Sequence, residues 1–165
     1  MTNDALRGRL LLWAAALAAA LAVGLPAFRP ALGDRASVLI GPAVGAGMFV
    51  GLAGARPPKL HAPPIARAAW LAASAAFEEL AWRAVALAVL AAWMGVMAAL
   101  LVTSIGFAAA HRARLGRRAR VHALTGAAFG AAFVCAGLVA AIAAHCVYNL
   151  LVDLAAGGER EPEPG

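Results

Sequence analysis

The chain has 165 residues, of which 64% are hydrophobic and only 13% are charged, and its mean hydropathy is +0.82. This composition excludes an ordinary soluble domain and predicts a protein that crosses a membrane several times. The net charge of +6 does not indicate nucleic-acid binding. The arginines gather at the ends of apolar segments, where membrane proteins carry them in cytoplasmic loops.

Residues 1–64 predict two membrane-spanning helices followed by a basic loop. An apolar run follows the polar residues 1–9, and we interpret it as an uncleaved first span in preference to a signal peptide. A second apolar stretch covers about 36–55 and carries glycines at small-xxx-small spacings, which allow helices to pack closely. The proline-rich segment 56–64 then breaks the helices and separates this pair from the rest of the chain.

Residues 65–156 predict a bundle of long helices, because no proline occurs between Pro64 and Pro162. Turns are expected at Met94-Gly95, at the basic segment 112–120 and at Gly137. The expected helices of this part cover 65–93, 96–115, 121–136 and 138–156. The remaining residues, 157–165, are short and charged and predict a disordered tail.

The predicted fold is therefore an all-α polytopic membrane bundle of about six transmembrane helices. Both termini and the basic segments 56–64 and 112–120 are expected on the cytoplasmic side of the plasma membrane. Arg29 and Arg35 are the only basic residues expected on the opposite side.

Residues 77–111 hold charged side chains in otherwise apolar sequence, among them Glu78, Glu79 and Arg83. A charged side chain at the centre of a membrane helix costs roughly 2.5–3.5 kcal/mol on insertion scales. Such residues mark functional sites by default, and they face the bundle interior or a water-filled cavity.

Glu78 and His111 are equally far along the chain from the turn at Met94-Gly95. In an antiparallel pair of helices with a rise of ~1.5 Å per residue, two such residues reach the same depth. The spacing therefore predicts that the carboxylate and the imidazole lie side by side near the middle of the membrane.

A second polar pair, His145 and Asn149, lies in the last apolar run, with the i, i+4 spacing that shares one helix face. His145 follows the turn at Gly137 by ~12 Å of helix, which is again near mid-membrane. Three helices are therefore expected to deliver polar groups to one level.

Glu79 and Arg83 are also i, i+4, with the acid first, and this spacing predicts an ion pair. One interpretation of the pair is a buried couple that only neutralises itself. Glu78 points about 100° away from Glu79 around the helix and has no counter-ion on its own helix. A carboxylate without a partner in apolar surroundings suits a general base or acid.

A carboxylate, two imidazoles and a carboxamide around a wet pocket suit water activation and stabilisation of an oxyanion. The zinc-protease motif H-E-x-x-H is absent. Glu78, His111 and His145 could still ligate a divalent metal such as zinc, so the residues alone leave metal-dependent and metal-free chemistry open. Serine or cysteine nucleophiles are weaker candidates, because none of them lies in a recognisable motif.

Taken together, these patterns resemble the three motifs of the CPBP intramembrane proteases. That family includes the type II CAAX prenyl endopeptidases and the Abi-type bacteriocin-processing or immunity proteins. The resemblance covers about residues 65–155. Its motifs are E-E-x-x-x-R at Glu78, Glu79 and Arg83, F-x-x-x-H at Phe107 and His111, and H-x-x-x-N at His145 and Asn149.

The resemblance implies an all-helical endopeptidase that works inside the bilayer on a membrane-associated peptide, such as a prenylated CAAX-like or leader-peptide substrate. In such an enzyme Glu78 activates water with help from His111, while His145 and Asn149 hold the oxyanion. The remaining motif residues, Glu79, Arg83 and Phe107, belong to or support the site. The competing interpretations are a non-catalytic immunity or scaffolding protein that retains the motifs, and a small transporter.

Overall fold

Helices account for nearly all of the residues that the computed structural model describes, which are 33, 35–53, 64–116 and 120–156. These residues contain no strand, so the predicted all-helical fold is confirmed for them. The predicted first span, most of the loop 56–64 and the tail 157–165 lie outside the described residues.

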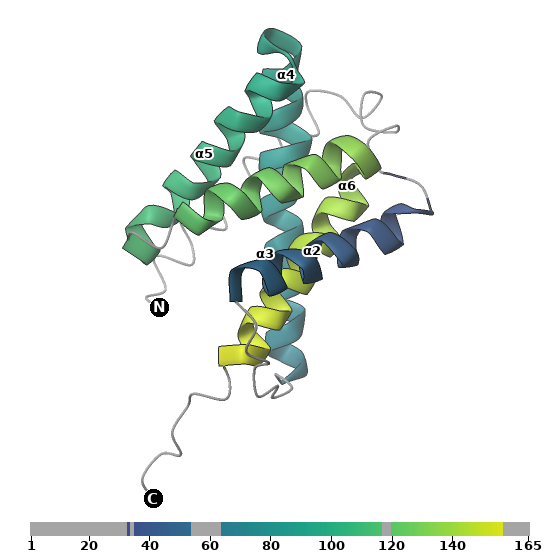
Figure 1. The fold of residues 1–165 in the computed structure, drawn as a ribbon, viewed down its shortest axis with the longest axis vertical. Helices are drawn as coiled ribbons and strands as arrows, with labels where there is room; N and C mark the ends of the chain where they lie inside the picture. Colours follow the sequence, from purple (N-terminus) through teal and green to yellow (C-terminus); the bar gives the residue numbers. More distant parts are fainter. Residues whose placement is uncertain (1–32, 34, 54–63, 117–119, 157–165) are drawn as a thin grey trace, which may run out of the picture.

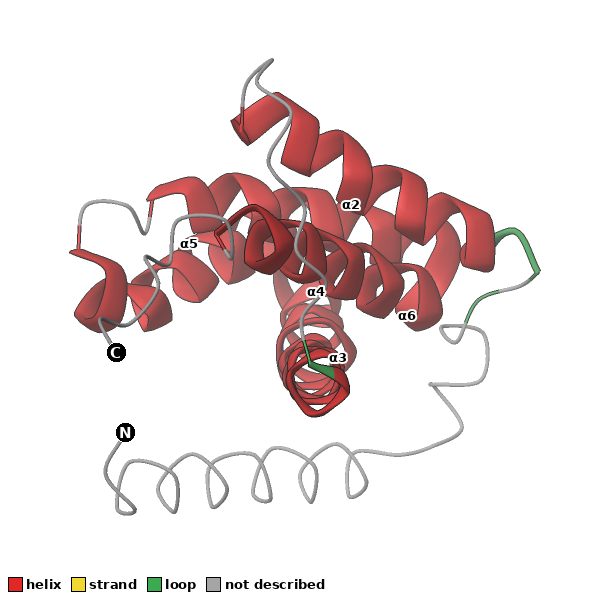
Figure 2. Ribbon diagram, turned by 90° about the horizontal axis from the view of Figure 1, so that it is seen from below, coloured by secondary structure: helices red, strands yellow, loops and turns green. Residues whose placement is uncertain are grey.

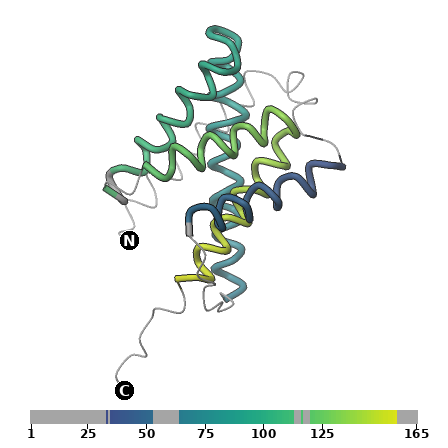
Figure 3. The backbone as a smooth tube through the Cα atoms, in the orientation of Figure 1, coloured from purple at the N-terminus to yellow at the C-terminus, as the bar shows by residue number. Residues whose placement is uncertain are grey.

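Three consecutive helical segments form one continuous column (Figure 3). They are α3 (Ile65–Glu79), the π-helix η3 (Leu80–Leu87) and α4 (Ala88–Met94). The extent of this column agrees with the predicted helix 65–93, but the wider π-helical turns were not predicted. π-helical turns occur frequently at functional sites, and this one turns Arg83, Ala84 and Leu87 into the protein interior.

Within the described residues, single glycines make two sharp corners, as the sequence predicts. Gly95 has a φ of 81° between α4 and α5 (Val96–Leu115), and Gly137 has a φ of 83° within α6 (Arg120–Ala156). Residues with a side chain rarely adopt such values, so glycine is required at both corners. The helical arms diverge from each corner, and the N-terminal arm of α6 lies beside α5 (Figure 1). Figure 2 shows that the described elements are helices.

Among the described residues, α6 is the one helix that is long and apolar enough to cross a membrane. Two shorter apolar helices cover Ser37–Leu52 and Val96–Arg112. Because α6 bends at Gly137, each of its arms is shorter than the ~20 residues that a perpendicular span requires. The structure therefore does not confirm six spans, and that number stays a prediction.

The helix α2 (Ser37–Ala53) packs against the C-terminal arm of α6 through small residues. Cβ atoms built at Gly41 and Gly45 would collide with the carbonyl oxygens of Ala140 and Ala144. At the start of α2, the Ser37 hydroxyl donates a 2.5 Å hydrogen bond to the carbonyl oxygen of Ala136. At this contact, called the α2–α6 seam below, the backbones of the two helices touch just before His145 on α6.

We predict that Gly45→Ala destabilises the seam, because the added methyl must displace the backbone of α6. Overpacking of this kind costs typically about 1–3 kcal/mol, and the melting temperature of the detergent-solubilised protein measures it. Gly47→Ala is the matched control, since a Cβ there meets nothing within 4 Å. Equal melting temperatures for the two variants would contradict the seam.

Candidate active site

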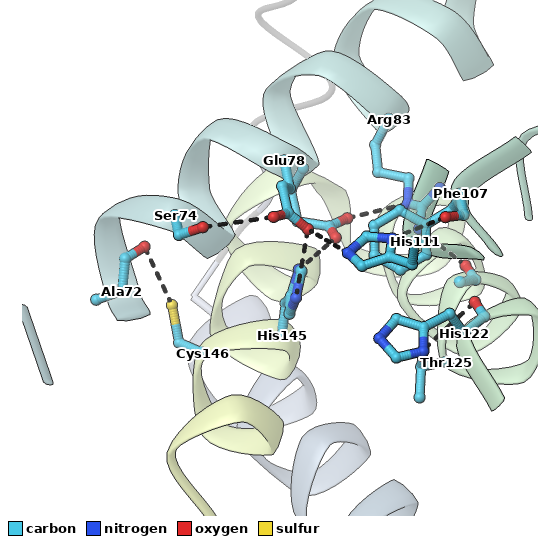
Figure 4. Close-up of polar contacts among 12 residues, drawn as sticks. Ala72, Ser74, Glu78, Arg83, Phe107, His111, His122, Thr125, His145 and Cys146 are labelled. Atoms are coloured by element: carbon cyan, nitrogen blue, oxygen red, sulfur yellow. Dashed lines mark hydrogen bonds and ion pairs between the residues drawn. The ribbon is translucent and has the colours of Figure 1, made fainter. Parts of the chain in front are cut away.

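The described helices bring two carboxylates, an arginine and three imidazoles into one cluster (Figure 4). Glu78 and Glu79 end α3, and Arg83 follows in η3. The α5 helix supplies Phe107 and His111, and α6 supplies His122 and His145.

A fully buried ion pair forms the base of this cluster. Arg83 Nε donates to Glu79 Oε2 at 2.9 Å, and neither side chain is exposed. Arg83 Nη2 also donates to the carbonyl oxygen of Gly126 at 3.0 Å, and its Cζ lies 5.4 Å from the Phe107 ring centroid. The predicted pair is confirmed, and it also ties η3 to α6.

The other oxygen of Glu79 orients His145. His145 Nδ1 lies 2.8 Å from Glu79 Oε1, both side chains being buried, and a carboxylate can only accept, so Nδ1 carries a hydrogen. The remaining nitrogen, Nε2, then faces Glu78 Oε2 at 3.9 Å. Glu79 therefore does more than neutralise Arg83, because it sets which edge of the imidazole points into the site.

A backbone carbonyl orients His111 in the same way. His111 Nδ1 lies 2.8 Å from the carbonyl oxygen of Phe107, one helical turn earlier, and must donate to it. His111 Nε2 faces Glu78 Oε2 at 3.7 Å. The predicted proximity of Glu78 and His111 is therefore confirmed.

Glu78 lies where these two imidazoles converge, and its side chain is 19% exposed. Its Oε1 accepts a 3.4 Å hydrogen bond from the Ser74 hydroxyl, whereas its Oε2 is too far from either Nε2 for a direct hydrogen bond. With both imidazoles neutral, three acceptors meet at one point. A water held between them, or a second proton on one imidazole, would supply the hydrogen that these acceptors lack.

The formal charges of the cluster can also be summed. Glu79 and Arg83 cancel each other, so Glu78 leaves one negative charge in the cluster when both imidazoles are neutral. A second proton on one imidazole would make the set electroneutral.

The metal-ligand set suggested by the sequence, Glu78, His111 and His145, converges on one point. Even so, no group of three His, Cys, Asp or Glu side chains in the described part of the chain has the geometry of a metal site.

Asn149 lies one turn beyond His145 on α6 and is half-buried. Its side chain makes no hydrogen bond to another described residue. The structure thus places Asn149 on the helix that carries His145, and its role in holding an oxyanion stays a prediction.

Sequence reasoning missed two contacts of the cluster. Ser74 precedes Glu78 by one helical turn, and that i, i+4 spacing was the available signal. The His122 ring stacks on the His111 ring, with centroids 4.5 Å apart and planes at 25°. These two histidines lie at similar distances on either side of Gly116, so the symmetry that paired Glu78 with His111 also indicates this contact.

Among sequence models of known protein families, the one described as "Type II CAAX prenyl endopeptidase Rce1-like" matches residues 60–151. The match covers more than half of the chain and includes every residue of the cluster. No curated protein and no solved structure matches the chain significantly.

We predict that Arg83→Gln lowers the yield of folded protein, because it leaves the buried Glu79 carboxylate without its counter-charge. Breaking a buried pair on one side costs typically about 3–5 kcal/mol. The double variant Glu79→Gln with Arg83→Gln should recover part of the yield, measured by size-exclusion chromatography in detergent. A double variant no better than the single one would contradict the ion-pair role.

Proposed function

This chain belongs to the Rce1-like family of type II CAAX prenyl endopeptidases, which are integral membrane proteases. We therefore propose that it is an intramembrane endopeptidase. We propose that it hydrolyses a peptide bond of a membrane-associated substrate. The two proposed substrate classes are prenylated CAAX-like segments and leader peptides, as the resemblance of the motifs implies.

The convergence of Glu78 Oε2 with the Nε2 atoms of His111 and His145, at 3.7 and 3.9 Å, is the observation that supports this proposal most. A water held between Glu78 and His111 has acceptors for both of its hydrogens. In the proposed step the oxygen of this water attacks the peptide carbonyl carbon, and Glu78 takes one proton from the water. Glu78 then gives the proton to the leaving nitrogen as the carbon–nitrogen bond breaks.

We assign the developing oxyanion to His145 and Asn149. His145 donates through Nε2 only when it carries its second proton, and Glu79 at 2.8 Å is then its counter-ion. In that state the positive charges of Arg83 and His145 balance the negative charges of the two glutamates. When the proton moves to Glu78 and the negative charge to the substrate, the sum stays zero, which suits a site away from water.

The non-catalytic alternative, a membrane immunity or scaffolding protein, requires no such balance. Membership of a protease family favours the peptidase. We also propose that the protein lies in the plasma membrane with both termini in the cytoplasm, because the predicted topology puts the basic segments 56–64 and 112–120 on one side of the membrane.

We predict that Glu78→Gln abolishes cleavage of a membrane-associated peptide by the purified protein, since an amide cannot take a proton from water. His111→Ala and His145→Ala should also be inactive. Asn149→Ala should keep residual turnover, because losing one oxyanion donor costs on the order of 10²–10³ in rate. Cleavage is measured by mass spectrometry of the products, with a thermal melt of each variant.

Cys146→Ala is the matched control, because Cys146 adjoins His145 but bonds only toward the carbonyl oxygen of Ala72. It should retain activity. An inactive but folded Cys146→Ala would point to a thiol nucleophile, and full activity of Glu78→Gln would contradict the proposed function.

Treatment with a chelator distinguishes a metal-free mechanism, in which Glu78 is the base, from a metal-dependent one. On the proposed glutamate-base route, dialysis against a strong chelator leaves turnover unchanged, and added zinc does not raise it. Loss of turnover that zinc restores would contradict this route. It would instead assign Glu78, His111 and His145 as metal ligands.

A further inference from the structure

Each of the two proposed active-site histidines has a flat ring stacked against it, and both rings come from the N-terminal arm of α6. His122 lies against His111, with centroids 4.5 Å apart and planes at 25°. Phe129 lies against His145, with centroids 4.7 Å apart and planes at 20°. Figure 4 shows His122 beside His111.

The spacing of His122 and Phe129 is two helical turns, so both lie on one face of α6. Gly126 lies between them on that face, where a Cβ would come within 3.3 Å of the Phe107 ring and of the Ser104 backbone. This glycine lets α6 approach α5 closely. This face of α6, which carries His122, Gly126 and Phe129, therefore packs against the imidazoles of both His111 and His145.

The stacked ring matters more to His111 than to His145. A charged, buried carboxylate holds His145, whereas the anchors of His111, the Phe107 carbonyl and the Phe107 ring at 4.6 Å, both come from its own helix. The distance of 3.7 Å from His111 to Glu78 is too long for a direct hydrogen bond. His122 is thus the close ring contact that reaches His111 from another helix.

The face of the His122 ring, and not its nitrogens, makes these contacts. Its side chain forms no hydrogen bond to a described residue, and its Nδ1 is buried without a partner. The centroid of its ring lies 4.5 Å from the centroid of the His111 ring and 6.0 Å from that of the Phe107 ring. At the matching place beside His145 the stacked ring is the phenyl group of Phe129, which has no nitrogen to offer.

We infer that His122 is a positioning residue, whose ring stacks on His111 and keeps His111 Nε2 directed at Glu78. The inference rests on the proposed hydrolytic function of the same site. It adds a residue outside the three sequence motifs, and it assigns that residue's action to ring shape.

Two substitutions separate ring shape from other roles. His122→Ala removes the stacked ring and should lower kcat by roughly 10–100-fold with KM within about twofold, because a small misplacement of a catalytic group is costly. His122→Phe keeps a flat ring and should hold kcat within about threefold of the unsubstituted protein. Leu124→Ala is the control, since Leu124 is 60% exposed on the same helix. Unchanged kcat in His122→Ala, or equal losses in His122→Ala and His122→Phe, would overturn the inference.

A second readout does not depend on turnover. The chain has four histidines, so ring ¹⁵N resonances of His111 can be assigned by their loss in His111→Ala. His111 should be protonated at Nδ1 in the unsubstituted protein and in His122→Phe, and should become a mixture of tautomers in His122→Ala. A His111 tautomer unaffected by His122→Ala would overturn the inference even in an active enzyme. Absence of turnover in the unsubstituted protein, with these tautomers as expected, would instead contradict the proposed function alone.

Discussion

The shared carboxylate of Glu79 is the interaction on which the rest of the site depends. One of its oxygens accepts from Arg83 at 2.9 Å and the other accepts from His145 at 2.8 Å, with no exposure of either carboxylate or guanidinium. Such a buried pair is weak as a source of stability, because desolvation offsets much of its attraction. Its value here is geometric, since it joins the column of α3 and η3 to α6 and fixes the edge that His145 presents to Glu78.

The site could be predicted from sequence wherever local periodicity determined it. The i, i+4 spacing gave the ion pair of Glu79 and Arg83, and equal distances from the turn at Gly95 paired Glu78 with His111. The bond from His145 to Glu79 spans 66 residues, and no periodic pattern connects residues that far apart. The π-helical turns were also missed, because nothing in Leu80–Leu87 distinguishes them from α-helical sequence.

The fold, like the site, could be predicted from the sequence only in part. The helix ends and the glycine corners follow from proline, glycine and apolar runs, whereas the divergence of the arms follows from packing between helices that are distant in sequence. The α2–α6 seam is an example of such packing. The family match begins at residue 60, yet Gly41 and Gly45 of α2 press on the arm of α6 that carries His145. The arm of α6 that carries His145 therefore packs against a helix that precedes residue 64, and the domain boundary at that residue stays a prediction.

The most direct measurement is the density between Glu78 Oε2 and the Nε2 atoms of His111 and His145 in a high-resolution experimental structure of the protein in lipid. We expect an ordered water within hydrogen-bond distance of Glu78 and His111, with both Nδ1 atoms still bonded to the Phe107 carbonyl and to Glu79. Rings turned so that Nδ1 faces Glu78, or a Glu78 side chain directed into the lipid, would contradict the proposed arrangement for water activation.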